Sequence, residues 1–559
     1  MLRLALLSLA IFAAAWLEFT VFPGHSYLEG ETQIYLPMLE RVDAPGLLAR
    51  DLVATNPTLS LTAYDEATLF LHEAGRQPFR RALLGQQFVF RMAALAGLFL
   101  LARSTGLSHL FALILATIVN LGAALAGPSL SLTEREPVPG AFAFGLILLA
   151  MGLMANEKPL LAGLAGGVAF LYDPVLALPF WSVLLAGFFF DGSWRRVIRP
   201  TLPIFLVFVL LLANLAQLQP GAGGDPVFAR VSPQLAMFQR TYTPYLYVSA
   251  WPNGDVYQFL ALFVFGLWAA ARCWPLLNVC FRWLVLGSGF CGLLSIAASY
   301  LLLDVGHFAW AARLQPARML LFTVAASALL FGLAGMRAIL LRSAWQALGW
   351  FWLLFALPMS TGIFDFLRVT NGRQLSRFAM AFALAALLTG LLLRFAFGSA
   401  RFLTLAAPAL ASLALTQLPG LRPPPVPFRE SINKMAKWAD GGTWGSSVFL
   451  FADAGRAGYP AVFRAQSRHA LWADWKSAQG VAFSESAAAR WQERWDRTMA
   501  NGFSPERLQS FLPKPIDYYV LRRPNQLAGA PYVFADRDFV VYDAQDLRNA
   551  PKPLRLGKE

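Results

Sequence analysis

Residues 2–22 read LRLALLSLAIFAAAWLEFTVF, an apolar run in which Arg3 and Glu18 are the only charged residues. Its length matches the roughly 20 residues of helix that cross a bilayer. A cleaved signal peptide is one interpretation, because Ala13–Ala15 resembles a cleavage site. The run continues through Phe19, beyond the length of a typical signal-peptide core, so the sequence favours a retained membrane anchor.

Similar apolar runs recur along the chain and predict a polytopic helical membrane protein. The 559 residues are 57% hydrophobic and only 14% charged, whereas soluble domains are about 25% charged. This composition excludes an ordinary cytosolic enzyme and a disordered protein. With the first run, we predict thirteen spans, the others being 83–102, 107–126, 141–155, 160–171, 175–190, 202–218, 257–271, 276–302, 319–336, 344–358, 378–393 and 402–418.

The charge density changes near residue 420. Lys, Arg, Asp and Glu number 44 in residues 1–420 but 34 in residues 421–559, and the second density is that of a water-soluble domain. A proline-rich linker at 422–427 separates the two parts. We therefore predict a mainly α transmembrane domain over 1–420 and a soluble α/β domain over 421–559. In the latter, helices are expected at 428–438 and 487–499 and strands at 447–451, 517–521 and 532–542.

Arg and Lys in the short loops set the predicted orientation. Most of them fall on one side if the N-terminus is cytoplasmic, which makes the C-terminal domain extracytoplasmic in a plasma (inner) membrane protein. Two long outer segments result. Residues 25–81 are expected to form amphipathic surface helices broken at Pro37, Pro45 and Pro57, and residues 219–254 a mobile loop. The basic residues that give the net charge of +14 are scattered, which argues against nucleic-acid binding.

Two acidic pairs and one arginine are the candidate functional residues. Glu29 and Glu31 follow the first helix on the outer side, where they can bind a metal ion or activate a hydroxyl; the alternative is a solvated acidic loop. Glu134 and Glu136 form a second outer pair, which Arg135 between them can simply neutralise. Both pairs can face one cavity.

Arg318 lies at the start of the helix that continues from residue 319, within the segment Leu314-Gln315-Pro316-Ala317-Arg318. A guanidinium there, together with free backbone amides, suits a phosphate group. The alternative is an arginine that reaches to lipid phosphates. Asp173, between two apolar runs, is interpreted as a turn residue.

The pattern resembles the GT-C superfamily of polytopic membrane glycosyltransferases, in a poorly characterised bacterial branch. The stretches that carry the resemblance span nearly the whole chain. They are Glu31-Thr32-Gln33-Ile34-Tyr35-Leu36-Pro37, Arg50-Asp51, Leu132-Thr133-Glu134-Arg135, Leu314-Gln315-Pro316-Ala317-Arg318, Ala473-Asp474-Trp475-Lys476 and Trp491-Gln492-Glu493-Arg494.

The resemblance implies transfer of a sugar from a polyprenyl-phosphate donor to an acceptor on the outer face of the membrane. It implies Glu31 or Glu29 as general base. Arg318, with Gln315, is the expected site for the donor phosphate. A divalent ion (Mg or Mn) at Glu31, Glu134 and Glu136 is an additional expectation, and no other cofactor is expected. The alternatives are a transporter or flippase of lipid-linked or envelope precursors and a non-catalytic envelope scaffold. A transporter is expected to show repeats, and the sequence has none.

Overall fold

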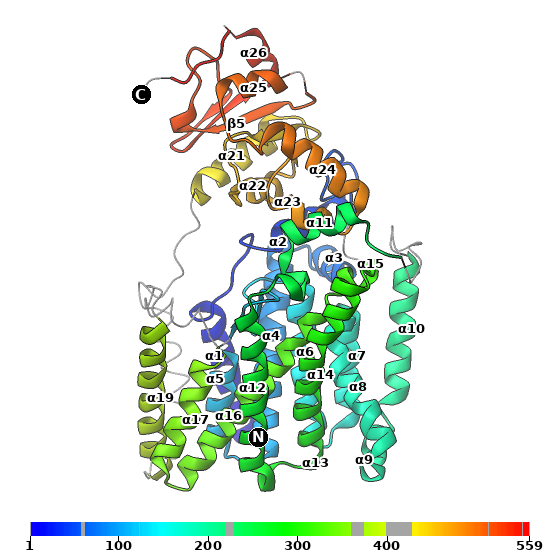
Figure 1. Ribbon diagram of the computed structural model, residues 1–559, viewed down its shortest axis with the longest axis vertical. Helices are drawn as coiled ribbons and strands as arrows, with labels where there is room; N and C mark the ends of the chain where they lie inside the picture. Colours follow the sequence, from blue (N-terminus) through cyan, green and yellow to red (C-terminus); the bar gives the residue numbers. More distant parts are fainter. Residues whose placement is uncertain are drawn as a thin grey trace.

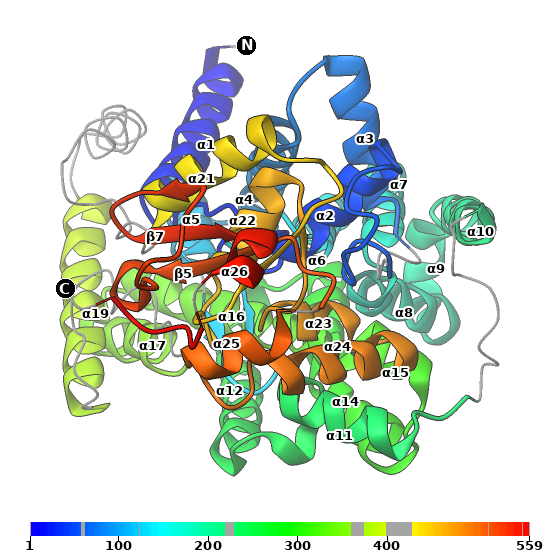
Figure 2. The same cartoon turned by 90° about the horizontal axis from the view of Figure 1, so that it is seen from above.

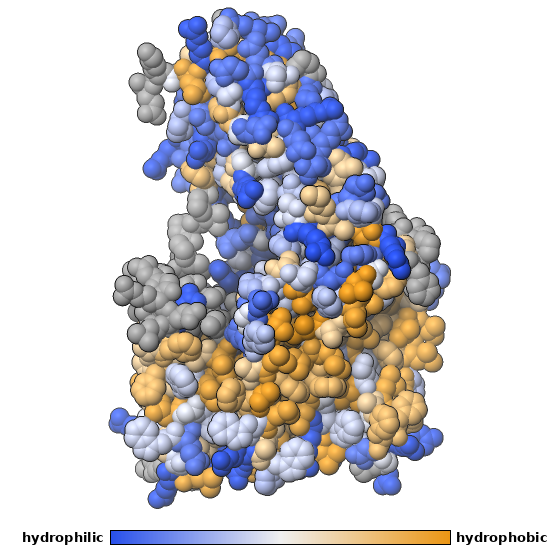
Figure 3. Space-filling model, viewed as in Figure 1, coloured by the Kyte–Doolittle hydropathy of each residue, from blue (hydrophilic) through white to orange (hydrophobic). Residues whose placement is uncertain are grey.

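The protein is a bundle of long apolar helices with a smaller sheet-containing domain at one end (Figures 1 and 2). The computed structural model describes residues 2–56, 62–121, 123–218, 229–358, 374–397, 428–512, 514–550 and 552–557. Figure 3 shows a hydrophobic surface over the bundle and a hydrophilic one over the domain. This division matches the change in charge density along the sequence.

The bundle is built from the predicted apolar segments. Five helical segments are long and apolar enough to span a membrane, namely Phe79–Ser104, Asn253–Leu276, Val279–Val305, Ala309–Leu340 and Arg377–Ala396. Seven shorter apolar helices accompany them. Together they confirm twelve of the thirteen predicted helices, and the thirteenth, 402–418, lies outside the described residues. These apolar helices make the chain a membrane protein.

The helices of the bundle have the following bounds: α1 (Leu2–Thr20), α4 (Phe79–Ser104), α5 (His109–Asn120), α6 (Pro139–Ala155), α7 (Pro159–Tyr172), α8 (Pro174–Phe190), α9 (Gly192–Ile198), α10 (Leu202–Leu218), α12 (Asn253–Cys273), α13 (Val279–Phe281), α14 (Gly287–Ser299), α15 (Ala309–Leu314), α16 (Leu320–Leu340), α17 (Ala344–Ala356) and α19 (Gln374–Phe397). Figure 1 shows α9 and α13 at the end far from the sheet domain. In Figure 2, α10 and α19 lie at opposite edges of the bundle.

The first outer segment folds into two helices, α2 (Thr32–Asp43) and α3 (Tyr64–Gly75). The predicted break at Pro37 is wrong, because Pro37 lies inside α2. A proline leaves the carbonyl four residues earlier without its usual N–H partner. Here that carbonyl, on Gln33, accepts a hydrogen bond of 3.1 Å from Arg464, so the helix continues. α2 does end near Pro45, as predicted, with Asp43 as its last residue and Ala44 as its C-cap, whereas Pro57 lies outside the described residues.

The second outer segment is also more ordered than predicted over its described part, 229–254. It contains α11 (Pro233–Tyr242) followed by two 3₁₀ turns. The side-chain amide of Gln239 donates a hydrogen bond to the backbone carbonyl of Ala482. The rings of Phe238 and Tyr242 pack against the Trp491 ring. The expected mobile loop is therefore wrong for these residues, because contacts with the C-terminal part fix them.

The C-terminal part is the predicted α/β unit around a five-stranded sheet of order β4-β3-β5-β7-β6. β3 pairs in parallel with β4 and β5, and β7 pairs antiparallel with β5 and β6. Its elements are α21 (Arg429–Gly442), β3 (Val448–Phe451), α22 (Tyr459–Ser467), β4 (Ala470–Leu471), α23 (Ser477–Val481), α24 (Glu485–Thr498), α25 (Pro505–Phe511), β5 (Tyr518–Arg522), β6 (Phe534–Ala535), β7 (Phe539–Asp543) and α26 (Ala544–Asn549). The predicted helices and strands are confirmed, while the linker at 422–427 lies outside the described residues.

Candidate active site

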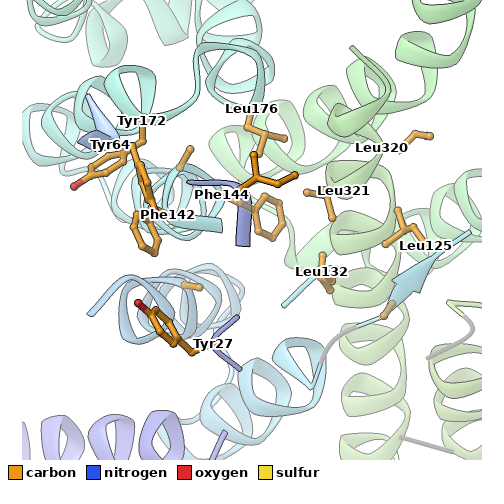
Figure 4. Close-up of a cluster of buried hydrophobic side chains, with 14 of the residues drawn as sticks. Tyr27, Tyr64, Leu125, Leu132, Phe142, Phe144, Tyr172, Leu176, Leu320 and Leu321 are labelled. Atoms are coloured by element: carbon orange, nitrogen blue, oxygen red, sulfur yellow. The ribbon is translucent and has the colours of Figure 1, made fainter. Parts of the chain in front are cut away.

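A cavity of about 270 Å³ lies where the bundle meets the C-terminal unit. Its walls combine the segment after α1, the hairpin formed by β1 (Ala124–Leu125) and β2 (Leu130–Ser131), helices α4, α6, α8 and α16, and the segment before α23. One side is apolar, with Phe144, Leu176 and Leu321 among the side chains drawn in Figure 4. The charged residues of the lining are Glu31, Arg91, Glu134, Glu136, Arg318 and Lys476.

The cavity brings together five of the six residues singled out from the sequence. They are Glu31, Glu134, Glu136, Gln315 and Arg318. Glu29 does not line it. The Glu29 carboxylate instead lies 3.9 Å from Arg135 and 3.8 Å from Arg429. The two acidic residues of the first pair therefore have different surroundings.

A sharp turn of the chain places Arg318 in the cavity. Gln315 adopts a left-handed backbone conformation (φ +52°), which ends α15, and Pro316 begins the 3₁₀ turn that leads into α16. The Arg318 guanidinium then lies between two carboxylates, 3.8 Å from Glu31 and 3.4 Å from Asp173. With a side chain only 16% exposed, Arg318 is a partly dehydrated cation, and a cation in such a setting binds anions more strongly than one in water.

Asp173 is a site residue that sequence reasoning missed. Its Oδ1 accepts hydrogen bonds from the amides of Val175 and Leu176 and so caps α8, the turn role that was predicted. Its Oδ2 accepts a hydrogen bond of 3.4 Å from Arg318, 145 residues away. Gly140 makes this approach feasible, because a Cβ there would lie 3.2 Å from Asp173 Oδ2 and 3.5 Å from Arg318 Nη1. Asp173 thus holds Arg318 in position.

Glu31 is placed by the beginning of α2, for which it is the N-cap residue. Its Oε2 accepts a hydrogen bond of 3.3 Å from the hydroxyl of Tyr35, one turn along the same helix. Burial, followed by the charge of Glu31, raises the pKa of the Tyr35 phenol, which therefore stays a proton donor to the carboxylate. The Glu31 side chain is 39% exposed, so its carboxylate is accessible to a ligand.

Glu136 has a positioning role. Its Oε1 accepts hydrogen bonds of 2.6 Å from the amides of both Glu29 and Gly30, and its Oε2 accepts one of 2.9 Å from Thr32. A carboxylate that binds backbone amides at a helix start is stabilising. Glu136 therefore fixes the loop that carries Glu31. The expected divalent ion at Glu31, Glu134 and Glu136 stays a prediction.

Glu134 faces the same cavity in a more buried setting. Burial raises its pKa to about 7, and the charges of Glu31 and Glu136 act in the same direction. Its backbone carbonyl accepts hydrogen bonds from Gln87 and Arg91, which fix the segment after β2. In the described part of the chain, no group of three or more His, Cys, Asp or Glu side chains is arranged to bind a metal ion.

The C-terminal unit contributes directly to the cavity through Lys476 and Gln479. Lys476 Nζ donates a hydrogen bond of 2.6 Å to the Gln479 side chain, which holds the ammonium group. The stretch Ala473-Asp474-Trp475-Lys476 was among those that carry the family resemblance, but no local pattern indicates that Lys476 shares a cavity with Arg318. Lys476 is a further cation of the lining, besides Arg91 and Arg318.

A buried arginine attaches the C-terminal unit to the segment after α1. Arg464 is fully buried and lies 3.0 Å from Asp474 and 3.7 Å from Asp51. It also donates to Ser477 and to the carbonyl of Gln33. This network joins α2, which begins beside Glu31, to the residues that precede α23, and it thereby holds Lys476 near the cavity.

Comparisons with known proteins give similarities to solved structures only. No family model matches the chain, and no curated protein matches it. Two solved structures are of ArnT from Cupriavidus metallidurans. The structure with bound undecaprenyl phosphate is 13% identical in sequence to this chain, with a TM-score of 0.37, and the match covers 97% of both chains. The apo structure is 12% identical, with a TM-score of 0.36, and the match covers 98% of this chain and 99% of that one.

The third structure is the Archaeoglobus fulgidus oligosaccharyltransferase in complex with Zn and sulfate. It is 12% identical to this chain with a TM-score of 0.37, and the match covers 98% of this chain and 74% of that one. The chain is thus similar to these proteins over nearly its whole length, at low sequence identity and low TM-score. The function is therefore inferred from the residues of the cavity.

Proposed function

We propose that the protein is a membrane glycosyltransferase that moves a sugar from a polyprenyl-phosphate donor to an acceptor on the outer face of the membrane. One observation carries the proposal: a carboxylate, Glu31, and a partly buried guanidinium, Arg318, lie 3.8 Å apart in a cavity at one end of an apolar helix bundle. A lipid-linked sugar phosphate needs a cation for the phosphate and a base for the acceptor close to the edge of the bilayer.

The phosphate is assigned to Arg318 and Lys476. An arginine can hold two phosphate oxygens with its planar fork, whereas lysine provides a compact point charge. Gln315, which lines the same cavity, is a further candidate ligand. When the phosphate binds, it replaces Glu31 as the partner of Arg318 and leaves the Glu31 carboxylate free to accept a proton. Asp173 keeps Arg318 in place throughout.

In the proposed reaction, the acceptor hydroxyl gives its proton to Glu31 while the acceptor oxygen attacks the anomeric carbon of the sugar. The bond between that carbon and the phosphate oxygen breaks, and its electron pair leaves with the polyprenyl phosphate. Arg318 and Lys476 stabilise the charge on the departing phosphate. General-base catalysis of this kind contributes about 10²–10⁴-fold.

The proposal includes the orientation in which the C-terminal domain, 421–559, is extracytoplasmic in the plasma (inner) membrane and the N-terminus is cytoplasmic. The described arginines at the end of the bundle far from the cavity, such as those of α9, favour this orientation by the positive-inside rule. An alkaline phosphatase fused after Glu559 is expected to be active, and a fluorescent protein that folds only in the cytoplasm is expected to be dark. The opposite pair of results would contradict the orientation.

Donor binding tests the function and separates it from its alternatives. In nanodiscs, the native protein is expected to bind polyprenyl phosphate more tightly than the uncharged polyprenol. Arg318→Lys should weaken this binding and Arg318→Ala should abolish the preference for the phosphate. Arg135→Ala is the matched control, since Arg135 lies next to Glu29 but does not line the cavity.

A second readout distinguishes an enzyme from a flippase or a scaffold. Incubation with a panel of polyprenyl-phosphate sugars and an extract of envelope glycolipids should release polyprenyl phosphate and transfer the sugar. Movement of the lipid between leaflets without release would indicate a flippase. No preference for phosphate in the native protein, or full binding in Arg318→Ala, would refute the proposed site.

A further inference from the structure

A second cavity, of about 700 Å³, lies among helices α12, α16 and α17. Its lining is mostly apolar and aromatic, with Phe265, Trp268, Trp350 and Trp352 among the residues. The Trp268 and Trp350 rings pack with centroids 4.8 Å apart. Trp268 is 48% exposed, so the groove opens on the outer surface of the bundle, where the bilayer lies. None of the residues that line it belongs to the site described above.

The groove lies at the far end of the bundle from that site. Arg337, which lines the groove, follows Arg318 by 19 residues, nearly all of them in α16, and at 1.5 Å per residue this separation is about 28 Å. The hydrocarbon core of a bilayer is about 30 Å thick. The two cavities therefore face opposite leaflets.

Two arginines line the groove at the ends of the helices α12 and α16. Arg272 lies in the last turn of α12 and Arg337 in the last turn of α16, and both line the groove. Neither guanidinium makes an ion pair or a hydrogen bond with a side chain of the described residues. From Arg272 the groove reaches back to Phe265, seven residues or about 10 Å into the span. It thus combines two available cations at the interface with an apolar channel beneath them.

We propose that this groove binds one anionic phospholipid of the leaflet opposite the candidate active site. The lipid phosphate lies between Arg272 and Arg337, and an acyl chain lies along Trp268 and Trp350. Basic pockets between membrane helices recognise anionic head groups in this way, because guanidinium–phosphate hydrogen bonds are charge-assisted. A zwitterionic lipid brings its own cation beside the arginines and binds less well. This site does not depend on the proposed transferase function.

Two kinds of variant test the two halves of the groove. Arg272→Gln/Arg337→Gln removes both cations. Gly349→Leu fills the apolar channel: Gly349 lines the groove, and no atom lies within 4 Å of a Cβ built on it. The matched control is Arg196→Gln/Arg199→Gln, which removes two exposed charges at or beside α9.

The experiment uses the full chain, purified in detergent and stripped of lipid, with dioleoyl phosphatidylglycerol and dioleoyl phosphatidylcholine as probes. Native mass spectrometry should detect one tightly held phosphatidylglycerol, and thermal melting should shift upward with it more than with phosphatidylcholine. Both test variants should bind it at least about tenfold more weakly, while the control pair binds like the native protein.

Equal retention of the two lipids, or native-like binding by Gly349→Leu, would overturn the proposal. Coverage of the groove by a second copy of the chain in the absence of lipid would also overturn it. Gly349→Leu retains every charge of the protein, so the test stands even if the arginine double variant does not fold.

Discussion

Arg464 allows the attachment of the C-terminal unit to the bundle to be tested quantitatively. The change is Arg464→Met, which keeps an unbranched side chain and removes the guanidinium. Arg464 is 0% exposed, and it lies 3.0 Å from Asp474 and 3.7 Å from Asp51. The substitution also removes the hydrogen bond that satisfies the carbonyl of Gln33 above Pro37.

Removing one partner of a buried ion pair costs about 3–5 kcal/mol, because the other charge stays buried without compensation. Asp51 keeps hydrogen bonds from the amides of Val53, Ala54 and Leu471, and Asp474 keeps those from the amide and the hydroxyl of Ser477. These donors place the expected cost near the lower limit, about 3 kcal/mol. For a cooperative unit of about 150–250 residues, this lowers the Tm by about 6–12 °C.

Arg50→Met is the matched control in the same interface. The Arg50–Asp517 pair is equally short, at 3.1 Å, but its side chains are 41% and 43% exposed. An exposed pair contributes about 0–1 kcal/mol, so the Tm should fall by at most about 4 °C. Thermal melting followed by tryptophan fluorescence is a suitable assay, because the Trp491 indole donates to the carbonyl of Asp474. Equal shifts in the two variants would refute the assignment of Arg464 as the main attachment.

Three further predictions concern the cavity. Glu31→Gln should reduce sugar transfer by about 10²–10⁴-fold with an unchanged Tm, while Glu29→Gln should reduce it less than tenfold; equal losses would remove the distinction between them. The affinity for polyprenyl phosphate should fall as the pH rises through about 7, because Glu134 then loses its proton and adds a negative charge beside the phosphate. Glu134→Gln should abolish this pH dependence. A pH profile that is the same in Glu134→Gln as in the native protein would contradict the role of Glu134. Gly140→Val should weaken donor binding at least tenfold by displacing Asp173, which holds Arg318, since even a Cβ at Gly140 would lie only 3.2 Å from Asp173 Oδ2; native-like binding would show that the pair does not need this space.

The helices were predictable because length and apolarity act locally. Twelve apolar runs gave helices close to the predicted bounds, since a helix satisfies its own backbone hydrogen bonds within the bilayer. A turn at Ala535-Asp536-Arg537-Asp538 is also predictable from local sequence, because two of its four residues are aspartates. Asp536 accepts hydrogen bonds there from the amides of Asp538 and Phe539, which is the local pattern that acidic turn residues provide.

The remaining features depend on contacts between residues far apart in the sequence. Pro37 has no N–H to donate to the carbonyl of Gln33. Nothing near Pro37 indicates that Arg464, 431 residues from Gln33, donates this hydrogen bond instead. The capture of the Glu31 loop by Glu136 and the pairing of Asp173 with Arg318 are of the same kind. Candidate residues could be predicted by type and as members of the loops at one end of the bundle, but their separation into cavity-lining and supporting groups required the folded chain.

The central claim is that Arg318 binds the phosphate of a lipid-linked donor beside Glu31. A structure of the protein in nanodiscs with bound polyprenyl phosphate tests it most directly. The claim predicts phosphate oxygens at about 2.7–2.9 Å from the Arg318 guanidinium, the prenyl chain leaving the cavity toward the bilayer, and the contact between Arg318 and Glu31 broken. A lipid phosphate bound elsewhere, with Arg318 still between Glu31 and Asp173, would contradict it.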